Sequence, residues 1–450
     1  MAPRPDTPRN ARLSAPFKMQ RILIQFAVTL GLLPLVARAV GPDYLFDDRE
    51  PADRVSDLAT PLSEIEAAEP RGKLFRDTDE PFIRDLEFSL RPRFYFRSLR
   101  NASGLNNTFA GGGSVGFTTG WWREMIQFGV AGFTSQPLAK NQNGRDRTGL
   151  VAPDGDGFSV LGLAWAQLKA SPATATIYRQ ELHLPFIHAN DSRLIPNTFE
   201  AYQIEVKPLE FLRFGLGYVA RIKLRNGDTF IPMSEAAGAP QVNRGTGFAG
   251  FVFGAEDKTY LGAITETTFD LYTSTYAQTG HTWRPGQEWE VRGDLQFADQ
   301  RGVGKREIGD FDTQFYGAQL SAGYGGVVGS LAYTYTSSGQ GLLDPYGAAP
   351  GFNGLMISNF AAGGESSYGA GLSYDFGTIG LDGLTAFASY VYGTLPSGGW
   401  EQEINGTVDY RMNSGFFRNL WLRVRYAYNE SGAGVPINDF RAILNYTVTF

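Results

Sequence analysis

The chain has 450 residues, a net charge of −6 and no cysteine. The lack of cysteine excludes a disulfide scaffold and a cysteine-ligated metal site, and no basic cluster of the kind that binds nucleic acid is present. Glycine (55 residues) and aromatic residues (14%) are abundant, which favours strands and tight turns over helices.

The chain begins with an export signal. An apolar segment, residues 22–36, follows two basic residues and precedes an Ala-Arg-Ala sequence. A basic start, a short apolar core and a small-residue cleavage site are typical of a secretory signal peptide. The segment is shorter than the ~20 residues that a membrane-spanning helix needs. We therefore predict a signal peptide over residues 1–39, with Met19 as the true start.

An acidic leader follows the signal. Residues 40–85 contain 13 acidic and 6 basic side chains, a net charge of −7, and show no clean periodicity. A segment of this composition buries too little apolar surface to fold alone. We predict that it is largely disordered and lies in the periplasm.

The run from Leu420 to Tyr428 shows the pattern that dominates the rest of the chain. Every second side chain is apolar or aromatic, and the positions between them include Arg423 and Arg425. Alternate side chains of a strand point to opposite faces. After an export signal, this alternation favours an outer-membrane barrel with its apolar face toward lipid and its arginines toward a water-filled lumen.

The same alternation predicts about eighteen antiparallel strands from residue 86 to residue 450, an even number as in single-chain outer-membrane barrels. The predicted strands are 86–99, 108–120, 122–134, 158–168, 173–181, 198–206, 211–223, 247–255, 259–266, 269–282, 287–298, 312–323, 327–337, 366–376, 383–393, 400–412, 418–429 and 439–450.

The connections between these strands support a barrel independently. Those after even-numbered strands, from the fourth strand on, are mostly short, and several after odd-numbered strands are long; the short join at 267–268 is an exception. Short turns on one rim and long loops on the other are typical of an outer-membrane barrel. We predict an all-β transmembrane barrel over residues 86–450, closed by pairing of its first and last strands, with a bulge at Pro92.

One segment carries a family resemblance: Asn190-Asp191-Ser192-Arg193-Leu194-Ile195-Pro196, within residues 178–201. It resembles the third-loop segment of the OprD-type outer-membrane porins. The resemblance extends over about 86–450 and includes the first strand, the turn at 375–384, the strand at 422–427 and the aromatic C-terminus. It implies an eighteen-stranded barrel in the bacterial outer membrane, usually trimeric, that conducts small carboxylate-bearing solutes. It implies nothing about the acidic leader.

The resemblance also implies that the loop at 182–197 folds into the barrel and constricts it. Asp191, Ser192 and Arg193 would then line the constriction. A second interpretation is compatible with the first: the segment forms a local turn whose side chains cap the backbone, with Arg193 salt-bridged to the wall.

Inward-facing arginines on the first and the last three strands predict a basic ladder down one wall of the lumen. Guanidinium groups bind carboxylates in bidentate fashion, and a series of such sites lets an anion move from one to the next. The alternative is that arginine simply fills a polar lumen, paired with Asp409 and Glu87. The predicted ladder consists of Arg91, Arg93, Arg97, Arg411, Arg423, Arg425 and Arg441.

An acidic counter-wall is predicted on the eleventh strand, from Glu288, Glu290 and Asp294. Opposite a basic wall it would create a transverse field that orients a solute. Arg292 lies among these acids, so its positive charge offsets part of their negative charge.

The sequence thus predicts a porin for facilitated diffusion of small carboxylate-bearing solutes, such as aromatic acids or amino acids, and not an enzyme. Its expected partners are outer-membrane lipid and lipopolysaccharide, the solute and, in a homotrimer, copies of itself. No cofactor, metal or catalytic residue is expected. One alternative is an outer-membrane hydrolase that uses His183, His188, Asp191 and Ser192, although proximity in sequence is weak evidence for a triad. The other is a barrel whose long loops bind an external partner.

Overall fold

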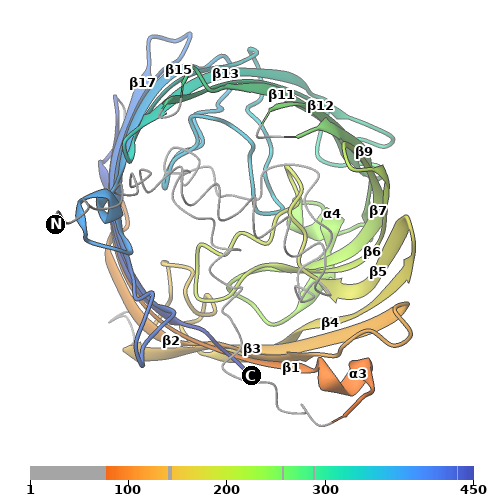
Figure 1. The fold of residues 1–450 in the computed structure, drawn as a ribbon. Helices are drawn as coiled ribbons and strands as arrows, with labels where there is room; N and C mark the ends of the chain where they lie inside the picture. Colours follow the sequence, from red (N-terminus) through yellow and green to blue (C-terminus); the bar gives the residue numbers. More distant parts are fainter. Residues whose placement is uncertain (1–77, 140–143, 256–257, 287–288, 433) are drawn as a thin grey trace, which may run out of the picture.

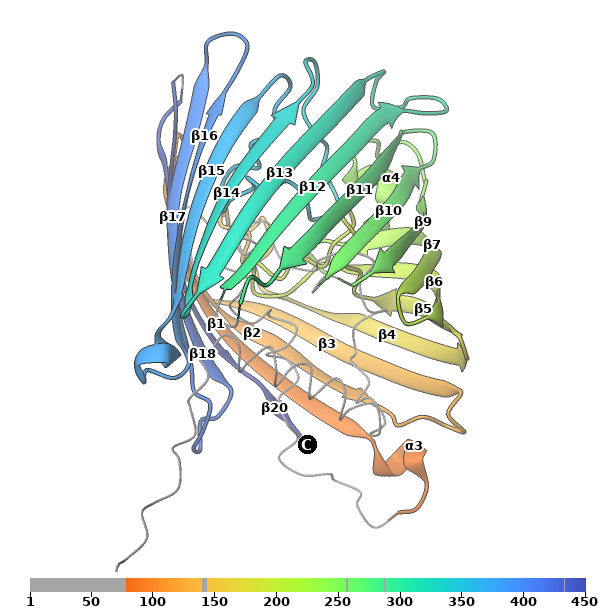
Figure 2. The same ribbon diagram turned by 45° about the horizontal axis from the view of Figure 1, so that its top comes forward.

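The computed structural model describes residues 78–450 apart from 140–143, 256–257, 287–288 and 433. The predicted signal peptide and most of the predicted leader lie outside the described residues. The described part forms a closed antiparallel barrel of eighteen long strands, as predicted. The ring is visible end-on in Figure 1, and the tilt of the strands in Figure 2.

Each long strand coincides with one of the predicted strands, with ends that differ by a few residues. The long strands are β1 (Glu87–Asn101), β2 (Gly104–Thr118), β3 (Ile126–Ala139), β4 (Phe158–Ala170), β5 (Ala173–Gln180), β6 (Thr198–Leu209), β7 (Leu212–Lys223), β9 (Thr246–Gly254), β10 (Thr259–Thr268), β11 (Tyr272–Trp283), β12 (Trp289–Gly302), β13 (Asp312–Tyr324), β14 (Val327–Thr336), β15 (Ser366–Asp375), β16 (Leu384–Thr394), β17 (Trp400–Arg411), β18 (Leu420–Ser431) and β19 (Ile437–Tyr446).

The remaining elements are short. They are α3 (Pro81–Arg84), β8 (Phe230–Pro232), α4 (Met233–Ala236), η3 (Phe376–Ile379) and β20 (Val448–Thr449). In the described ranges, no helix is both long and apolar enough to cross a bilayer. The helix α3 ends just before β1, and the backbone N–H of Gly120 donates to the carbonyl of Phe82, so the residues before the first strand pack against the turn between β2 and β3.

The barrel closes between its first and last strands, as predicted. Strand β1 pairs with β2 on one side and with β19 and β20 on the other. The predicted bulge at Pro92 is wrong, because the pairs Arg93–Asn445 and Ser89–Thr449 keep one register across it. The pairing of β1 with β19 and β20 is only interrupted between Leu90 and Arg93. On the other side Gly113 faces Pro92, and a Cβ at Gly113 would lie 1.8 Å from the Arg91 carbonyl oxygen, so only glycine fits.

Alternate side chains of the strands point outward and inward, with the apolar ones on the outer face, as predicted. On β18, Leu422 is 43% exposed on the outer face, whereas Arg425 is 2% exposed on the inner face. Large apolar side chains cover the outside of the other strands as well. Examples of this outer belt are Phe94, Val115, Leu216, Leu295, Leu331 and Tyr368.

The longest connections leave the same rim and fold inward, within the ring seen in Figure 1. We call them loop 2 (residues 144–157, the described part), loop 3 (181–197), loop 4 (224–245) and loop 7 (337–365). Buried apolar side chains of loop 3, Phe186 and Ile187 among them, pack with Tyr346 of loop 7 and with lumen-facing residues of the wall. The loops therefore share one hydrophobic core inside the barrel.

Candidate functional site

Loop 3 crosses the lumen and binds to the wall at β1. The two Nη atoms of Arg93 contact the two carboxylate oxygens of Asp191 at 2.6 Å each. The hydroxyl of Tyr95 donates to the carbonyl of Ser192 at 3.1 Å. Three residues before Asp191, the backbone N–H of His188 donates to the carbonyl of Tyr346 in loop 7 at 2.9 Å. Asp191, Ser192 and Arg193 are therefore held inside the barrel next to the arginine-bearing strands.

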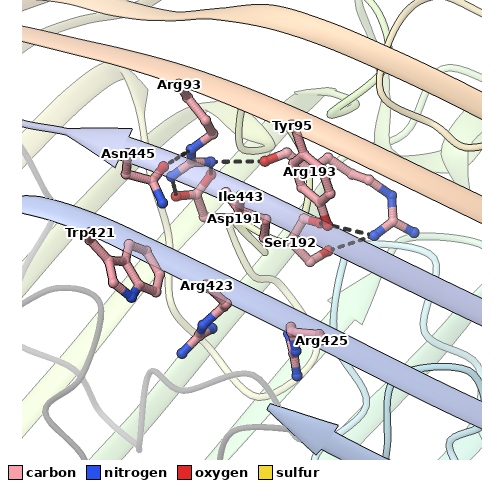
Figure 3. A pocket seen from close by; sticks show the side chains of 10 residues that line it. All are labelled: Arg93, Tyr95, Asp191, Ser192, Arg193, Trp421, Arg423, Arg425, Ile443 and Asn445. Atoms are coloured by element: carbon pink, nitrogen blue, oxygen red, sulfur yellow. Dashed lines mark hydrogen bonds and ion pairs between the residues drawn. The ribbon is translucent and has the colours of Figure 1, made fainter. Parts of the chain in front are cut away.

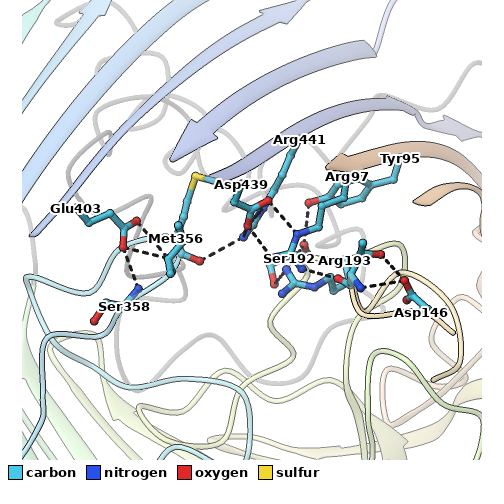
Figure 4. Close-up of polar contacts among 12 residues, drawn as sticks. Tyr95, Arg97, Asp146, Ser192, Arg193, Met356, Ser358, Glu403, Asp439 and Arg441 are labelled. Carbon is cyan, nitrogen blue, oxygen red and sulfur yellow. Dashed lines mark hydrogen bonds and ion pairs between the residues drawn. The ribbon is translucent and has the colours of Figure 1, made fainter. Parts of the chain in front are cut away.

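A buried ion triad closes the seam between β1 and β19. Arg97 binds the carboxylate of Asp439 through Nε (3.0 Å) and Nη2 (2.6 Å), and Arg441 binds the same carboxylate at 2.8 Å. Arg97 also donates to the carbonyl of Thr148 in loop 2, and Arg441 to that of Met356 in loop 7 at 3.2 Å. The triad thus ties two inward loops to the wall (Figure 4).

A second ion pair lies on β17 and β18. Arg423 binds Asp409 through Nε and Nη2 at 2.7 and 2.8 Å, and the indole of Trp421 donates to the same carboxylate at 3.0 Å. The guanidinium carbons of Arg423 and Arg411 lie 4.6 and 5.2 Å from the centroid of the Trp421 ring. Arg425 donates from Nε to Thr407 Oγ1 at 3.2 Å.

Three arginines of the predicted ladder, Arg93, Arg423 and Arg425, line one narrow cleft together with the predicted constriction residues. Figure 3 shows the side chains of β1, β18, β19 and loop 3 that surround it. Arg97, Arg441, Arg91 and Arg411 lie outside this cleft. The lining residues are Arg93, Tyr95, Asp191, Ser192, Arg193, Trp421, Arg423, Arg425, Ile443 and Asn445.

Arg193 at the tip of loop 3 has a different environment from the wall arginines. Its Nη1 donates to the carbonyl and the hydroxyl oxygens of Ser192 at 3.0 and 3.3 Å. Arg225 of loop 4 donates to the same hydroxyl at 2.5 Å. Burial, and next the positive charges of Arg97, Arg225 and Arg441, lower the pKa of Arg193 well below its usual value. Several guanidinium groups therefore gather around Ser192.

The predicted acidic counter-wall is paired with arginines. Glu288 lies outside the described residues. Glu290 contacts Arg284 at 3.1 Å, and Asp294 contacts Arg292 at 2.8 Å. Two further acidic side chains, Glu401 and Glu403, lie on β17 beside the arginine-bearing strand β18 and bind loop 7. Ser358 of loop 7 donates its backbone N–H to Glu403 at 2.9 Å and its hydroxyl to Glu401 at 3.0 Å.

Three residues in or beside the cleft were not predicted from the sequence: Trp421, Asp439 and Arg225. Trp421 and Asp439 share the strand face of Arg423 and Arg441, two residues away in each case, so the alternation that identified the arginines could also have identified them. Arg225 lies in loop 4, where no periodicity exists to place it.

The arrangement imagined for a hydrolase is not formed by the described residues. Asp191 binds Arg93, and the Ser192 hydroxyl accepts from Arg225. His183 Nδ1 instead lies 3.3 Å from His188 Nε2.

Comparison with known proteins agrees with the fold. The model of the OprD family of outer membrane porins matches residues 80–450. The porin-like protein GalP of Pseudomonas putida is 23% identical over 393 residues, which cover 82% of this chain and 93% of GalP. Porin D of Pseudomonas aeruginosa is 22% identical over 413 residues, 82% of this chain and 92% of Porin D.

Solved structures of porins have the same architecture. OccK9 (OpdG) of Pseudomonas aeruginosa superposes with a TM-score of 0.76 at 24% identity, and OpdK of the same species, crystallised with vanillate, with 0.75 at 23%. Both comparisons cover 82% of this chain and 100% of the other. The family match spans the whole barrel and includes the loop and the arginine-bearing strands described above. The chain therefore belongs to the OprD family of porins of the bacterial outer membrane.

Proposed function

We propose that the protein conducts small carboxylate-bearing solutes, such as aromatic acids or amino acids, by facilitated diffusion along its lumenal arginines, and that it catalyses no reaction. The observation that carries this proposal is the cleft in which Arg93, Arg423 and Arg425 from one wall of the barrel and Arg193 from loop 3 come together. Fixed guanidinium groups lower the barrier for an anion in a narrow polar path. Vanillate in the OpdK structure is itself a carboxylate, which is compatible with this choice of solute.

The test is the flux of a carboxylate relative to a neutral solute of similar size in a liposome swelling assay. We expect Arg423→Ala with Arg425→Ala to reduce carboxylate flux by roughly tenfold or more, since a hydrogen bond to a charged group contributes about 1.5–3 kcal/mol and about 1.4 kcal/mol is a factor of ten. Neutral flux should change little. Arg306→Ala serves as the control, because Arg306 forms an exposed pair with Asp310.

Removal of Arg423 also uncovers the carboxylate of Asp409. Arg425→Gln alone, at a residue that hydrogen-bonds to the Thr407 hydroxyl, separates the loss of a guanidinium from that effect. If wild type conducts carboxylates no faster than neutral solutes, or if the double variant keeps the wild-type ratio, the proposal is wrong.

The proposal includes the surroundings of the barrel. The apolar outer belt is suited to outer-membrane lipid and lipopolysaccharide, and a homotrimer is the proposed assembly. Chemical cross-linking of the protein in isolated outer membranes would reveal the assembly. A single monomer band at every cross-linker concentration would contradict the trimer and leave the solute proposal intact.

A further inference from the structure

We propose that Asn405 and Ser389, on the inner faces of β17 and β16, form a specificity-determining contact for an uncharged polar group of the solute, a hydroxyl above all. This inference rests on the proposed function, because the same solute would present its carboxylate to the arginines. It differs in chemistry and in place: the two side chains are neutral, belong to the wall and lie outside the cleft that the arginines line.

The two side chains are buried polar groups whose hydrogen-bonding capacity is unused. Asn405 is 2% exposed and Ser389 is 3% exposed. Among the residues that the structure describes, the amide oxygen and nitrogen of Asn405 and the hydroxyl oxygen of Ser389 have no hydrogen-bond partner. Buried polar groups in this state cost free energy, and few of them occur in a folded protein. A polar group of the solute would supply the partners that the fold does not.

The register of the strands places the two side chains together. Ser389 lies directly opposite Asn405 in the pairing of β16 with β17. Directly opposite residues of antiparallel strands have Cβ atoms about 4.5–5.5 Å apart. One hydroxyl group of a solute can therefore contact both side chains.

The neighbours of this pair on the two adjacent strands are short. Gly371 of β15 lies opposite Ser389, and Ala427 of β18 lies opposite Asn405. Glycine and alanine have no side-chain donor or acceptor. The row across these four strands therefore supplies no side-chain partner to the pair, and neither neighbour has a long side chain that would cover it.

The next inward-facing residues on one side connect the pair to the arginine wall. Thr407 lies two residues after Asn405 on β17 and accepts a hydrogen bond from Nε of Arg425 at 3.2 Å. Two residues of a strand span about 6.6–6.8 Å, which is comparable to the length of a substituted benzene ring. Phe387, opposite Thr407 and 5% exposed, adds an aromatic ring at this step. A carboxylate near Arg425 would therefore have the opposite end of its ring near Asn405.

Loop 7 bounds the pair on the side away from the arginines. Glu403, two residues before Asn405, accepts from the backbone N–H of Ser358 at 2.9 Å. Val391, opposite Glu403, packs with Leu355 and Phe360 of the same loop. The contact thus lies between a basic side and a closed side, which favours a polar group at the far end of a solute of limited length.

These features predict a preference among carboxylates. A hydroxyl both donates and accepts, and so does an asparagine amide in either orientation. We expect 4-hydroxybenzoate, whose hydroxyl lies across the ring from its carboxylate, to bind more tightly than benzoate. In 2-hydroxybenzoate the hydroxyl lies beside the carboxylate, so this isomer should gain nothing from the pair.

The test is the concentration-dependent block of the single-channel current by these three acids, in the full-length protein and three variants. Asn405→Leu keeps a side chain of similar shape without donor or acceptor, and Ser389→Ala removes the hydroxyl. Asn107→Leu makes the same change as the first variant at an exposed position of β2 and is the matched control. Circular dichroism of each variant verifies the β-barrel content.

We expect wild type and Asn107→Leu to bind 4-hydroxybenzoate about two- to tenfold more tightly than benzoate, the range for one hydrogen bond between neutral groups. Asn405→Leu should abolish this difference, Ser389→Ala should reduce it, and both should bind benzoate as wild type does. If both variants keep the wild-type preference for 4-hydroxybenzoate, the assignment to Asn405 and Ser389 is wrong.

The same recordings separate this inference from the proposed function. If all three acids block wild type equally well, water alone satisfies the two side chains, and only this inference fails. If none of the acids blocks wild type and it conducts carboxylates no faster than neutral solutes, the proposed function fails and the inference fails with it.

Discussion

Charged side chains in the lumen form groups in which one carboxylate binds two arginines. Asp439 is fully buried and binds Arg97 and Arg441, whose side chains are 8% and 3% exposed. Replacement of one member of a buried ionic group leaves the others charged in a poorly solvated place, and such losses cost about 3–5 kcal/mol.

We therefore predict that Asp439→Ala lowers the free energy of unfolding by about 3–5 kcal/mol, measured by denaturant titration in detergent micelles. The matched control is Asp310→Ala, which breaks the exposed ion pair with Arg306 and should cost less than about 1 kcal/mol. Equal midpoints for the two variants would show that the buried triad contributes no more than a surface pair.

A second residue-scale prediction concerns pH. Burial, and next the carboxylate of Asp191, raise the pKa of Glu181 in loop 3 from 4.5 to about 7, against the opposing charges of Arg91, Lys223 and Arg93. Because the folded state favours the neutral acid, the contribution of Glu181 to stability is complete below about pH 4.5 and is lost as the pH rises through 7.

Glu181→Gln should remove this part of the pH dependence, so that the melting temperature in detergent changes less between pH 5 and pH 8 than in wild type. His183 Nε2 lies 3.8 Å from Glu181, and His183→Gln on the Glu181→Gln background isolates the share of the histidine. Glu124→Gln in the exposed turn between β2 and β3 is the control. If the melting temperature of Glu181→Gln changes with pH as much as that of wild type, the pH dependence comes from other groups.

At the scale of elements, loop 3 is held against β1 by few polar contacts, of which the bidentate pair of Arg93 with Asp191 is the strongest kind. We predict that Asp191→Ala releases the loop tip from the wall and increases the single-channel conductance about twofold, since conduction depends on the width and the polar lining of the path. Asp154→Ala, at an exposed position of loop 2, should leave it unchanged. A conductance of wild-type size in Asp191→Ala would mean that the hydrophobic core of loop 3 holds it in place without this pair.

The elements also show what the sequence could predict. Strand positions and faces follow from a period-two pattern that each strand carries by itself, so β18 and its Arg423 and Arg425 were placed correctly. The sequence also named Asp409 as a partner of the lumenal arginines, and the structure pairs it with Arg423. Which arginine it binds depends on the register that places Asp409 opposite Arg423, and neither strand alone encodes that register. Arg225 approaches Ser192 only because two loops fold into the same space, which strand periodicity does not describe.

At the scale of the whole molecule, the described strands form one barrel, and the inward loops and the barrel wall share one hydrophobic core. The ring of strands and the inward loops depend on each other, because the loops pack on side chains of the wall. The predicted signal peptide and the predicted acidic leader precede this unit in sequence, and the family match begins at residue 80, shortly before β1.

The seam between β1 and β19 has a consequence for assembly. Arg97 and Asp439 are 342 residues apart in the chain, and contacts of such long range form late and slowly. Until the last strand arrives, both ends of the sheet are open edges that lipid cannot satisfy. A partly assembled barrel therefore has neither a sealed wall nor the completed arginine cluster. We therefore expect conduction and the proposed charge preference to appear together, in the step that joins β1 to β19.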